Sequence, residues 1–147
     1  MPQPSLHHVG CVVSSVSGSL GRWCAALSAI SASGSFDDPL QRARVAFLQL
    51  PPGGGACLEL VEPLSEDSPV ARFLKDGGGL HHLCFEVDDL DDQIRHMQGQ
   101  KAMLIRRPRP AVAFGGRRIA WMLTPEKLLV EYLERARPAD PPGQTST

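Results

Sequence analysis

The sequence predicts an α+β fold made of two βαβββ modules, because three segments of its first half recur in the same order in its second half. The recurring pairs are Leu6–Val9 with Leu80–Leu83, Arg44–Leu48 with Arg118–Met122, and Leu58–Leu60 with Val130–Tyr132. The first two pairs are 74 positions apart and the third is 72 positions apart. The second copy has therefore lost two residues, which we place in its final turn.

Each copy begins with a strand and a helix. The strands are predicted at Leu6–Val13 and Leu80–Val87, which are rich in β-branched and other apolar residues. The helices follow from apolar residues at helical spacing: Val16, Leu20, Trp23 and Leu27 in the first copy, and Leu90, Ile94 and Met97 in the second. Either Ser14 or Ser15 is suited to cap the first helix, and the acidic run Asp88–Asp92 is suited to open the second.

The remaining strands complete the modules. Hairpins are predicted from Val45–Leu50 with Cys57–Val61 and from Ile119–Leu123 with Leu128–Leu133, and weaker strands near Ala29–Ser33 and Met103–Arg106. Between the copies, Ser68 as N-cap and Pro69 as first helical residue predict a helix that Gly77–Gly79 ends. We therefore divide the chain into a first module (5–64), a linker helix with its glycine turn (65–79), a second module (80–135) and a disordered tail (136–147).

The composition excludes several classes of protein. The chain has 147 residues, of which 42% are hydrophobic and 21% charged, as in ordinary globular proteins. Its net charge of −1 gives no reason to expect a nucleic-acid or membrane partner. It has no apolar run long enough to cross a membrane and no signal-peptide pattern at its start, so we expect a cytoplasmic location. The four cysteines form no C-x-x-C pair, which favours buried thiols over a zinc site.

A histidine pair and a strand glutamate recur in each copy and predict a metal site. Glu59 and Glu131 lie at matching places between apolar strand residues, where an unpaired carboxylate is unfavourable. One His and one Glu from each copy would suit a divalent ion such as Co, Mn, Ni, Fe or Zn, with two adjacent octahedral positions left for water or substrate. On a regular strand only one histidine of each pair faces the site, and the repeat does not choose between the first and the second.

This pattern resembles the vicinal-oxygen-chelate superfamily, which includes glyoxalase I, extradiol dioxygenases, bleomycin-resistance proteins and the methylmalonyl-CoA epimerases. The segments that resemble the epimerases are Arg44–Leu48, Glu59–Leu64, Glu66–Leu74, Gly78–Asp89, Pro108–Pro110 and Gly115–Trp121. The likeness extends over about residues 5–134. It implies curved mixed sheets of the glyoxalase type around a metal site.

The resemblance also implies a site and an activity. The metal ligands that it implies are His8, Glu59, His82 and Glu131. His7 and His81 would then face away and fill core or surface positions. The implied protein is a metal-dependent epimerase or isomerase, a homodimer, that removes an α-proton from an acyl-CoA-like substrate of the methylmalonyl-CoA type. Glu131 would act as the base and the metal would stabilise the enolate.

Some segments depart from the epimerase pattern. The first helix ends with Trp23–Ser28 instead of an aromatic-rich segment with Leu-Gly, and Asp37–Arg42 replaces the usual Pro-x-Gln-Gly. The strand within Arg42–Leu50 has no carboxylate, although some epimerases carry a catalytic glutamate there. An epimerase needs acid/base chemistry on both faces of its substrate, and Asp37 or Asp38 could swing in as the second group.

Two further alternatives stay open at this point. A basic cluster either contacts the phosphates of a carrier such as CoA or is a solvated arginine-rich surface; its members are Arg106, Arg107, Arg109, Arg117 and Arg118. The competing functions are a lyase of the glyoxalase I type and a non-catalytic binding protein of the bleomycin-resistance type. A ring-cleaving dioxygenase is disfavoured, because that chemistry uses two histidines and one carboxylate.

Overall fold

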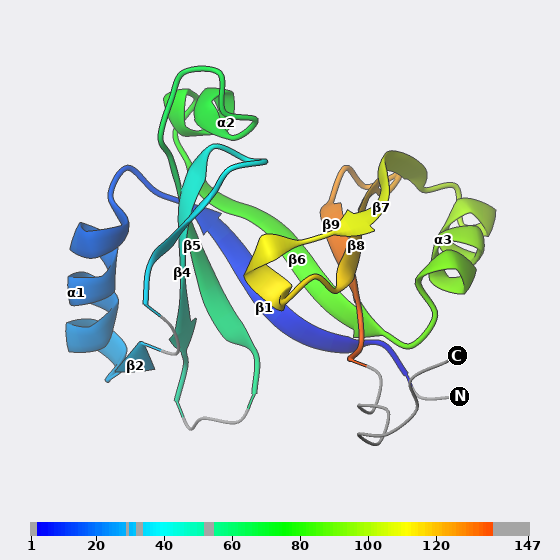
Figure 1. Ribbon diagram of the computed structural model, residues 1–147, viewed down its shortest axis with the longest axis horizontal. Coiled ribbons are helices and arrows are strands. Elements are labelled where there is room, and N and C mark those ends of the chain that lie inside the picture. Colours follow the sequence, from blue (N-terminus) through cyan, green and yellow to red (C-terminus); the bar gives the residue numbers. More distant parts are fainter. Residues whose placement is uncertain (1–2, 29, 32–33, 52–54, 137–147) are drawn as a thin grey trace, which may run out of the picture.

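A curled mixed sheet runs through the whole molecule, with a helix against its outer side at each end (Figure 1). The structure is a computed structural model that describes residues 3–28, 30–31, 34–51 and 55–136. The fold class expected from the sequence is confirmed. Nearly all of the predicted tail lies outside the described residues. No helix in the described part of the chain is both long and apolar enough to cross a membrane.

Among the described residues, the two halves follow a similar order of strands and helices, and each has one short element that the other lacks. The first half has β1 (Ser5–Val12), α1 (Val16–Leu27), β2 (Ile30–Ser31), β3 (Phe36–Asp38), β4 (Ala43–Gln49) and β5 (Cys57–Pro63). The short helix α2 (Ala71–Lys75) connects the halves. The second half has β6 (Gly79–Val87), α3 (Leu90–Gly99), β7 (Met103–Pro110), the 3₁₀ turn η1 (Val112–Phe114), β8 (Arg118–Leu123) and β9 (Leu129–Glu134).

The strand order shows the repeat directly. Among the described residues the sheet order is β2-β4-β5-β1-β6-β9-β8-β7, and β3 pairs with β4 at the side. In each half the first strand pairs in parallel with the last, as β1 does with β5 and β6 with β9. The halves join where β1 and β6 run antiparallel in the middle of the sheet (Figure 1). The central position of these two strands explains how two copies can share one site.

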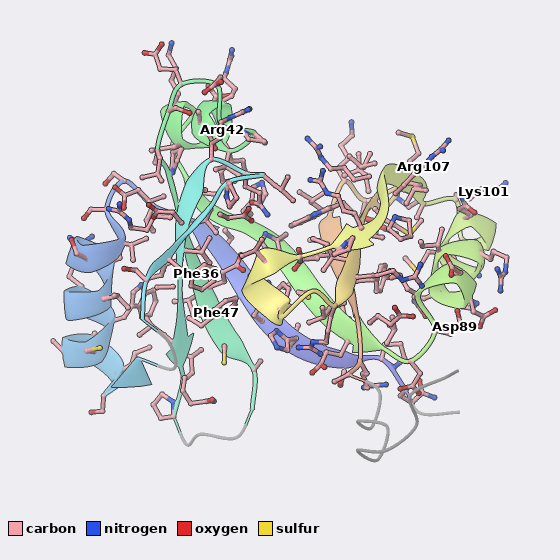
Figure 2. The ribbon with its side chains drawn as sticks, viewed as in Figure 1. Phe36, Arg42, Phe47, Asp89, Lys101 and Arg107 are labelled. Atoms are coloured by element: carbon pink, nitrogen blue, oxygen red, sulfur yellow. The ribbon has the colours of Figure 1, made fainter. Side chains whose placement is uncertain are left out.

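The two faces of the sheet bury different sets of side chains. On the outer face α1 packs on Ala46, Leu48, Leu58 and Leu60, and α3 packs on Ala120, Met122 and Val130. On the inner face lie Val45, Phe47 and Val61 in the first half, and Cys84, Trp121 and Leu133 in the second. Because side chains alternate along a strand, Glu59 and Glu131 fall on the inner face. The aromatic residues Phe36 and Phe47 lie close together in the first half (Figure 2).

The predicted helix starts are confirmed for the two long helices and wrong for the linker. Ser15, not Ser14, caps α1 by accepting from the Gly18 N–H at 3.1 Å. Asp89 caps α3 and lies at the opposite end of that helix from Lys101 (Figure 2). By contrast, α2 begins only at Ala71, three residues after the predicted cap.

The hydroxyl of Ser68 accepts from the Val70 N–H at 3.5 Å, ahead of α2, instead of from an N–H of the helix. It is buried and donates to the Gln41 carbonyl at 2.7 Å, which ties the linker to the first half. The glycine turn ends α2 as expected: the Gly78 N–H donates to the Phe73 carbonyl, and the residue has φ +67°. A Cβ at Gly78 would also lie 2.9 Å from the carbonyl oxygen of Val12.

Candidate metal centre

Two rows of residues cross the four central strands, β5, β1, β6 and β9. The rows are Glu59–Gly10–His82 and His8–Cys84–Glu131. Each row has a glutamate at one end, a histidine at the other end and a small residue between them. Each row also takes one of its two polar residues from each half of the chain. The inner face of the sheet therefore brings two histidines and two glutamates together at the junction of the halves.

His8, His82 and Glu131 each place a donor atom within 4.8 Å of the others, and Glu59 contacts both histidines. The Nε2 atom of His8 is 3.1 Å from Nε2 of His82, 3.3 Å from Oε1 of Glu131 and 3.6 Å from Oε2 of Glu59. The other oxygen of Glu59 is 3.4 Å from Nε2 of His82. All four residues are buried, with exposed fractions between 0% for His8 and 7% for Glu59. The structure thus brings together every predicted ligand.

These donors fit a divalent metal ion. Two donors bound at right angles to one ion, with bonds of about 2.1 Å, lie about 3 Å apart. The Oε1 atom of Glu131 is buried and, among the described residues, has no hydrogen-bond partner. A buried carboxylate oxygen without a partner is unfavourable unless a cation or proton satisfies it. The geometry therefore favours an ion among His8, Glu59, His82 and Glu131, and its binding there stays a prediction.

Burial sets the protonation of the four groups. It raises the pKa of Glu59 and that of Glu131 to about 7, while a hydrogen bond from the Cys84 thiol acts in the opposite direction on Glu131. Burial lowers the pKa of His8 and, together with the neighbouring histidines, lowers that of His82 well below its usual value. The imidazoles are therefore neutral and have a lone pair for a metal. The carboxylates take up and release protons near neutral pH.

A β-bulge on each central strand changes which histidines face the site. In the pairing of β1 with β6, the register skips His7 on one strand and His81 on the other. An extra residue interrupts the alternation of side chains and re-aims the one at the bulge. As a result, Nδ1 of His7 lies 2.8 Å from Nδ1 of His8, and Nδ1 of His81 lies 2.9 Å from Nδ1 of His82. The expectation that the first histidine of each pair faces away was wrong.

A second group of donors could also hold a metal ion. His7, His8 and Cys84 each place one ligand atom within 4.8 Å of the others. Only a thiolate binds metals well, and burial raises the pKa of the Cys84 thiol far above neutral pH. The pKa values of the two carboxylates of the first group are raised only to about 7, so these groups ionise far more easily. The charge balance therefore favours the His/Glu group.

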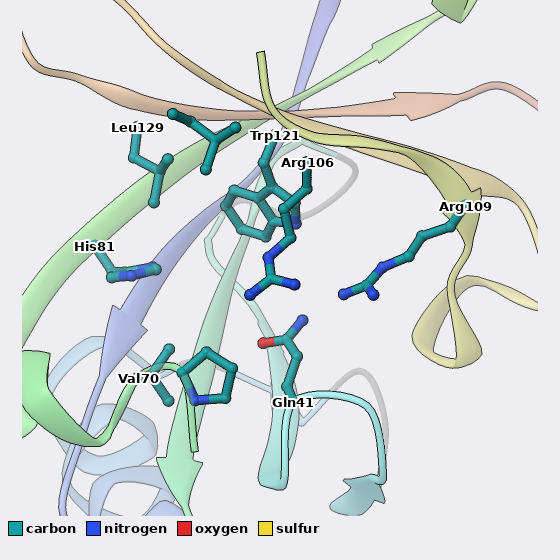
Figure 3. Close-up of a pocket in the computed structure, with 9 residues that line it drawn as sticks. Gln41, Val70, His81, Arg106, Arg109, Trp121 and Leu129 are labelled. Atoms are coloured by element: carbon teal, nitrogen blue, oxygen red, sulfur yellow. The ribbon is translucent and has the colours of Figure 1, made fainter. Parts of the chain in front are cut away.

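A pocket lies between the two halves beside this centre, because His81 and Trp121, which line it, both contact the ring of His82 (Figure 3). Its walls include Gln41 from the first half, Trp121 and His81 from the second, and the arginines Arg106 and Arg109 of β7. Both guanidinium groups point toward Gln41 (Figure 3). No acidic residue of the described chain pairs with either of them. Two unpaired arginines in a pocket favour an anionic ligand.

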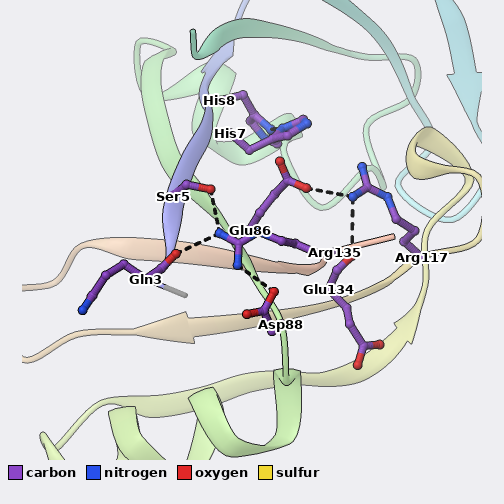
Figure 4. Close-up of polar contacts among 9 residues, drawn as sticks. All are labelled: Gln3, Ser5, His7, His8, Glu86, Asp88, Arg117, Glu134 and Arg135. Atoms are coloured by element: carbon purple, nitrogen blue, oxygen red, sulfur yellow. Dashed lines mark hydrogen bonds and ion pairs between the residues drawn. The ribbon is translucent and has the colours of Figure 1, made fainter. Parts of the chain in front are cut away.

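Two other members of the predicted basic cluster, Arg117 and Arg118, have structural partners. Arg117 donates to Glu86 at 2.9 Å, which fixes the segment after η1 next to His7 and His8 (Figure 4). Arg118 pairs with Glu134 at 2.9 Å and with an acidic residue of α3 at 3.2 Å. The two alternatives for the basic cluster therefore apply to different members. Arg117 and Arg118 are structural, whereas Arg106 and Arg109 line the pocket.

The two aspartates considered for acid/base chemistry lie on β3, a strand that the sequence did not predict. Asp37 is exposed and pairs with Arg44 at 3.0 Å. Asp38 is buried, with an exposed fraction of 7%, and accepts from the Leu40 N–H at 2.9 Å. It lies close enough to the centre for its charge to raise the pKa values of Glu59 and Glu131. Asp38 is thus already inside and does not need to swing in.

Comparison with known proteins decides the family. A family model of the Glyoxalase/Bleomycin resistance protein/Dioxygenase superfamily matches residues 7–121. The chain belongs to this superfamily. The match extends from the first histidine pair to β8 and includes three of the four residues of the centre. The resemblance inferred from the repeated segments is confirmed.

Within the superfamily, epimerases are among the similar proteins. The chain is 41% identical over 97 residues to the uncharacterized protein YqjC of Bacillus subtilis, covering 64% of this chain and 66% of YqjC. It is 43% identical over 56 residues to an ethylmalonyl-CoA/methylmalonyl-CoA epimerase of Cereibacter sphaeroides, covering 37% and 40%. The crystal structure of methylmalonyl-CoA epimerase from Mycobacterium tuberculosis superposes with a TM-score of 0.77 at 29% identity, covering 90% and 89%. Both sequence alignments span less than two thirds of the relative's length.

Proposed function

We propose that this protein is a metal-dependent epimerase or isomerase that moves the α-proton of an acyl thioester of the methylmalonyl-CoA type. The observation that carries the proposal is the buried, unpartnered Oε1 of Glu131, 3.3 Å from His8 in a cluster of two histidines and two glutamates. Support also comes from the relatives named methylmalonyl-CoA epimerases. The homodimer and the cytoplasmic location stay predictions.

The four clustered side chains would hold the ion, which when bound acts as a Lewis acid and makes the C–H beside a substrate carbonyl more acidic. The protein supplies the proton transfers. Glu131 is a buried carboxylate of the cluster, and we assign it as the general base. Asp38 is a buried carboxylate near the cluster but outside it. We therefore assign to Asp38 the proton transfer on the opposite face of the substrate.

The pocket determines which substrates enter. Arg106 and Arg109 would bind an acidic group, such as the carboxylate of the acyl part or a phosphate of its carrier. The indole of Trp121 and the side chain of Leu129 give the same pocket an apolar wall. A cavity that is apolar with a few converging cations suits an acyl thioester that carries negative charge.

Proton exchange tests this function. The protein is loaded in turn with Co, Mn, Ni and Zn and incubated with methylmalonyl-CoA in deuterated water, and α-deuterium is followed by mass spectrometry. We expect exchange in the wild type and a loss of about 10²–10⁴-fold in Glu131→Gln. Glu126→Gln, an exposed turn glutamate, is the matched control and should exchange normally.

The stereochemistry of the same experiment tests Asp38. If Asp38 transfers the proton on one face of the substrate, the Asp38→Asn variant should still catalyse α-proton exchange in one enantiomer. The rate at which this variant epimerises the substrate should fall. Absence of exchange with every metal, in a protein that binds those metals, would remove the epimerase assignment and favour another substrate in the same pocket.

A further inference from the structure

The two bulged histidines make the same contact in both halves of the molecule. His7 meets His8, and His81 meets His82, through the Nδ1 atoms of both rings at 2.8 and 2.9 Å. The Nε2 atoms of His8 and His82 point the other way, into the cluster, where they are 3.1 Å apart. Each bulged histidine therefore lies directly behind a proposed ligand, on the side away from the ion.

A metal ion bound to Nε2 would fix which nitrogen of the ligand histidine carries the proton. A neutral imidazole has one N–H and one lone pair, so an Nε2 that binds a metal requires the proton on Nδ1. That Nδ1–H needs an acceptor, because His8 is fully buried and His82 nearly so. Among the described residues, the adjacent histidine is the acceptor available to each. Metal-binding histidines generally donate their second N–H in this way, and the acceptor sets the ring orientation.

The bulged rings are themselves held in place. His7 has edge contacts with the rings of Phe114 at 5.5 Å and Phe47 at 6.3 Å. His81 has an edge contact with Phe73 at 4.7 Å and a wider one with Trp121 at 6.3 Å. Apolar rings at these positions would satisfy the packing equally well. The packing alone therefore does not explain a nitrogen acceptor at the same place in both halves.

We propose that His7 and His81 are positioning residues, each accepting the Nδ1 proton of the ligand histidine that follows it and so directing that ligand's Nε2 to the metal. In this view, the role of the two β-bulges is to place both histidines of a pair on the same face of the sheet. This inference rests on the proposed function, because it assumes that His8 and His82 bind the ion.

Cobalt binding to the full chain tests the inference without any substrate. The d–d absorption of bound Co²⁺ gives the affinity of the wild type and of His7→Phe, His81→Phe, His7→Asn and His81→Asn. Phenylalanine keeps the ring and removes the acceptor, whereas the asparagine oxygen replaces Nδ1. We expect each Phe variant to lose about 10–100-fold in affinity and each Asn variant to recover most of it. His96→Phe, on the exposed face of α3, should bind as the wild type does.

A second measurement covers the case in which a Phe variant does not fold. In the zinc-loaded wild type, ¹⁵N NMR should show protonated Nδ1 in His8 and His82, with N–N coupling across each hydrogen bond to the preceding histidine. Phe variants that fold and bind cobalt normally, or ligands without an Nδ1 proton, would overturn the inference and leave the proposed function intact. A wild type that binds no metal would instead overturn the proposed function, and this inference with it.

Discussion

Gly10 and Cys84 occupy matching positions on β1 and β6, each between a proposed ligand histidine and a proposed ligand glutamate on the flanking strands. Their small size matters because the imidazoles fold over them. A Cβ on Gly10 would lie 2.0 Å from Cε1 of His82. The spacing of 74 that relates the histidine pairs also relates these two residues. The repeat therefore relates these two residues in the sequence. A single sequence does not show, however, that the residue between the two ligands must be small.

Replacing Gly10 with alanine should displace His82. The clash lies with the ring of a buried side chain, so relief requires the ring or the strand to move, at about 1–3 kcal/mol. We expect Gly10→Ala to weaken cobalt binding strongly and to lower the melting temperature. Gly21→Ala is the control: Gly21 lies in α1 with nothing within 4 Å of its Cβ position, and alanine favours a helix. Equal cobalt affinity in both variants would contradict the close packing of His82 on β1.

The raised pKa values of Glu59 and Glu131 predict how metal binding depends on pH. At a pH below about 7 both carboxylates hold protons in the metal-free protein, and an ion must displace them. The histidines contribute little, because burial lowers their pKa values and they are already neutral. Affinity for cobalt should therefore rise as the pH increases through 6 to about 7 and flatten above it. Calorimetry in buffers of different ionisation enthalpy measures the protons released, and affinity independent of pH over this range would contradict the assignment.

At the level of elements, periodicity and repetition predicted most of the fold, and local hydrogen bonds determined the rest. The long strands and helices were predictable because their apolar spacing agrees with their burial. The start of α2 was not predictable, because Ser68 begins a turn, closed by the Ala71 N–H and the Ser68 carbonyl at 3.0 Å, instead of the helix. Nor were the two β-bulges, since a bulge arises from the pairing of strands and leaves no pattern in either one. The repeat pointed to the two glutamates and the two histidine pairs, and the resemblance to the epimerases was needed to choose His8 and His82 as proposed ligands.

The cap of α1 gives a direct test at this scale. The sequence left Ser14 and Ser15 open, and the structure has the Ser15 hydroxyl accepting from the Gly18 N–H. We expect Ser15→Ala to lower the free energy of unfolding by about 1 kcal/mol, because it leaves helix N–H groups without a partner. Ser14→Ala should have little effect. Chemical denaturation of both variants measures the difference, and equal destabilisation would argue against this cap.

At the scale of the whole molecule, neither half contains a complete site. Each half provides one histidine and one glutamate, and the four meet only because β1 and β6 pair in the middle of one sheet. In the structure one chain brings all four residues together. The repeat is thus the physical origin of the site as well as of the fold.

The measurement that tests this account most directly is X-ray absorption at the cobalt edge of the loaded full chain. We expect one cobalt ion per chain, with imidazole nitrogens and carboxylate or water oxygens around it and no sulfur. That environment matches His8, Glu59, His82 and Glu131. Sulfur in the coordination shell would point to His7, His8 and Cys84 instead. That result, or a chain that takes up no cobalt, would contradict a metal centre made of His8, Glu59, His82 and Glu131.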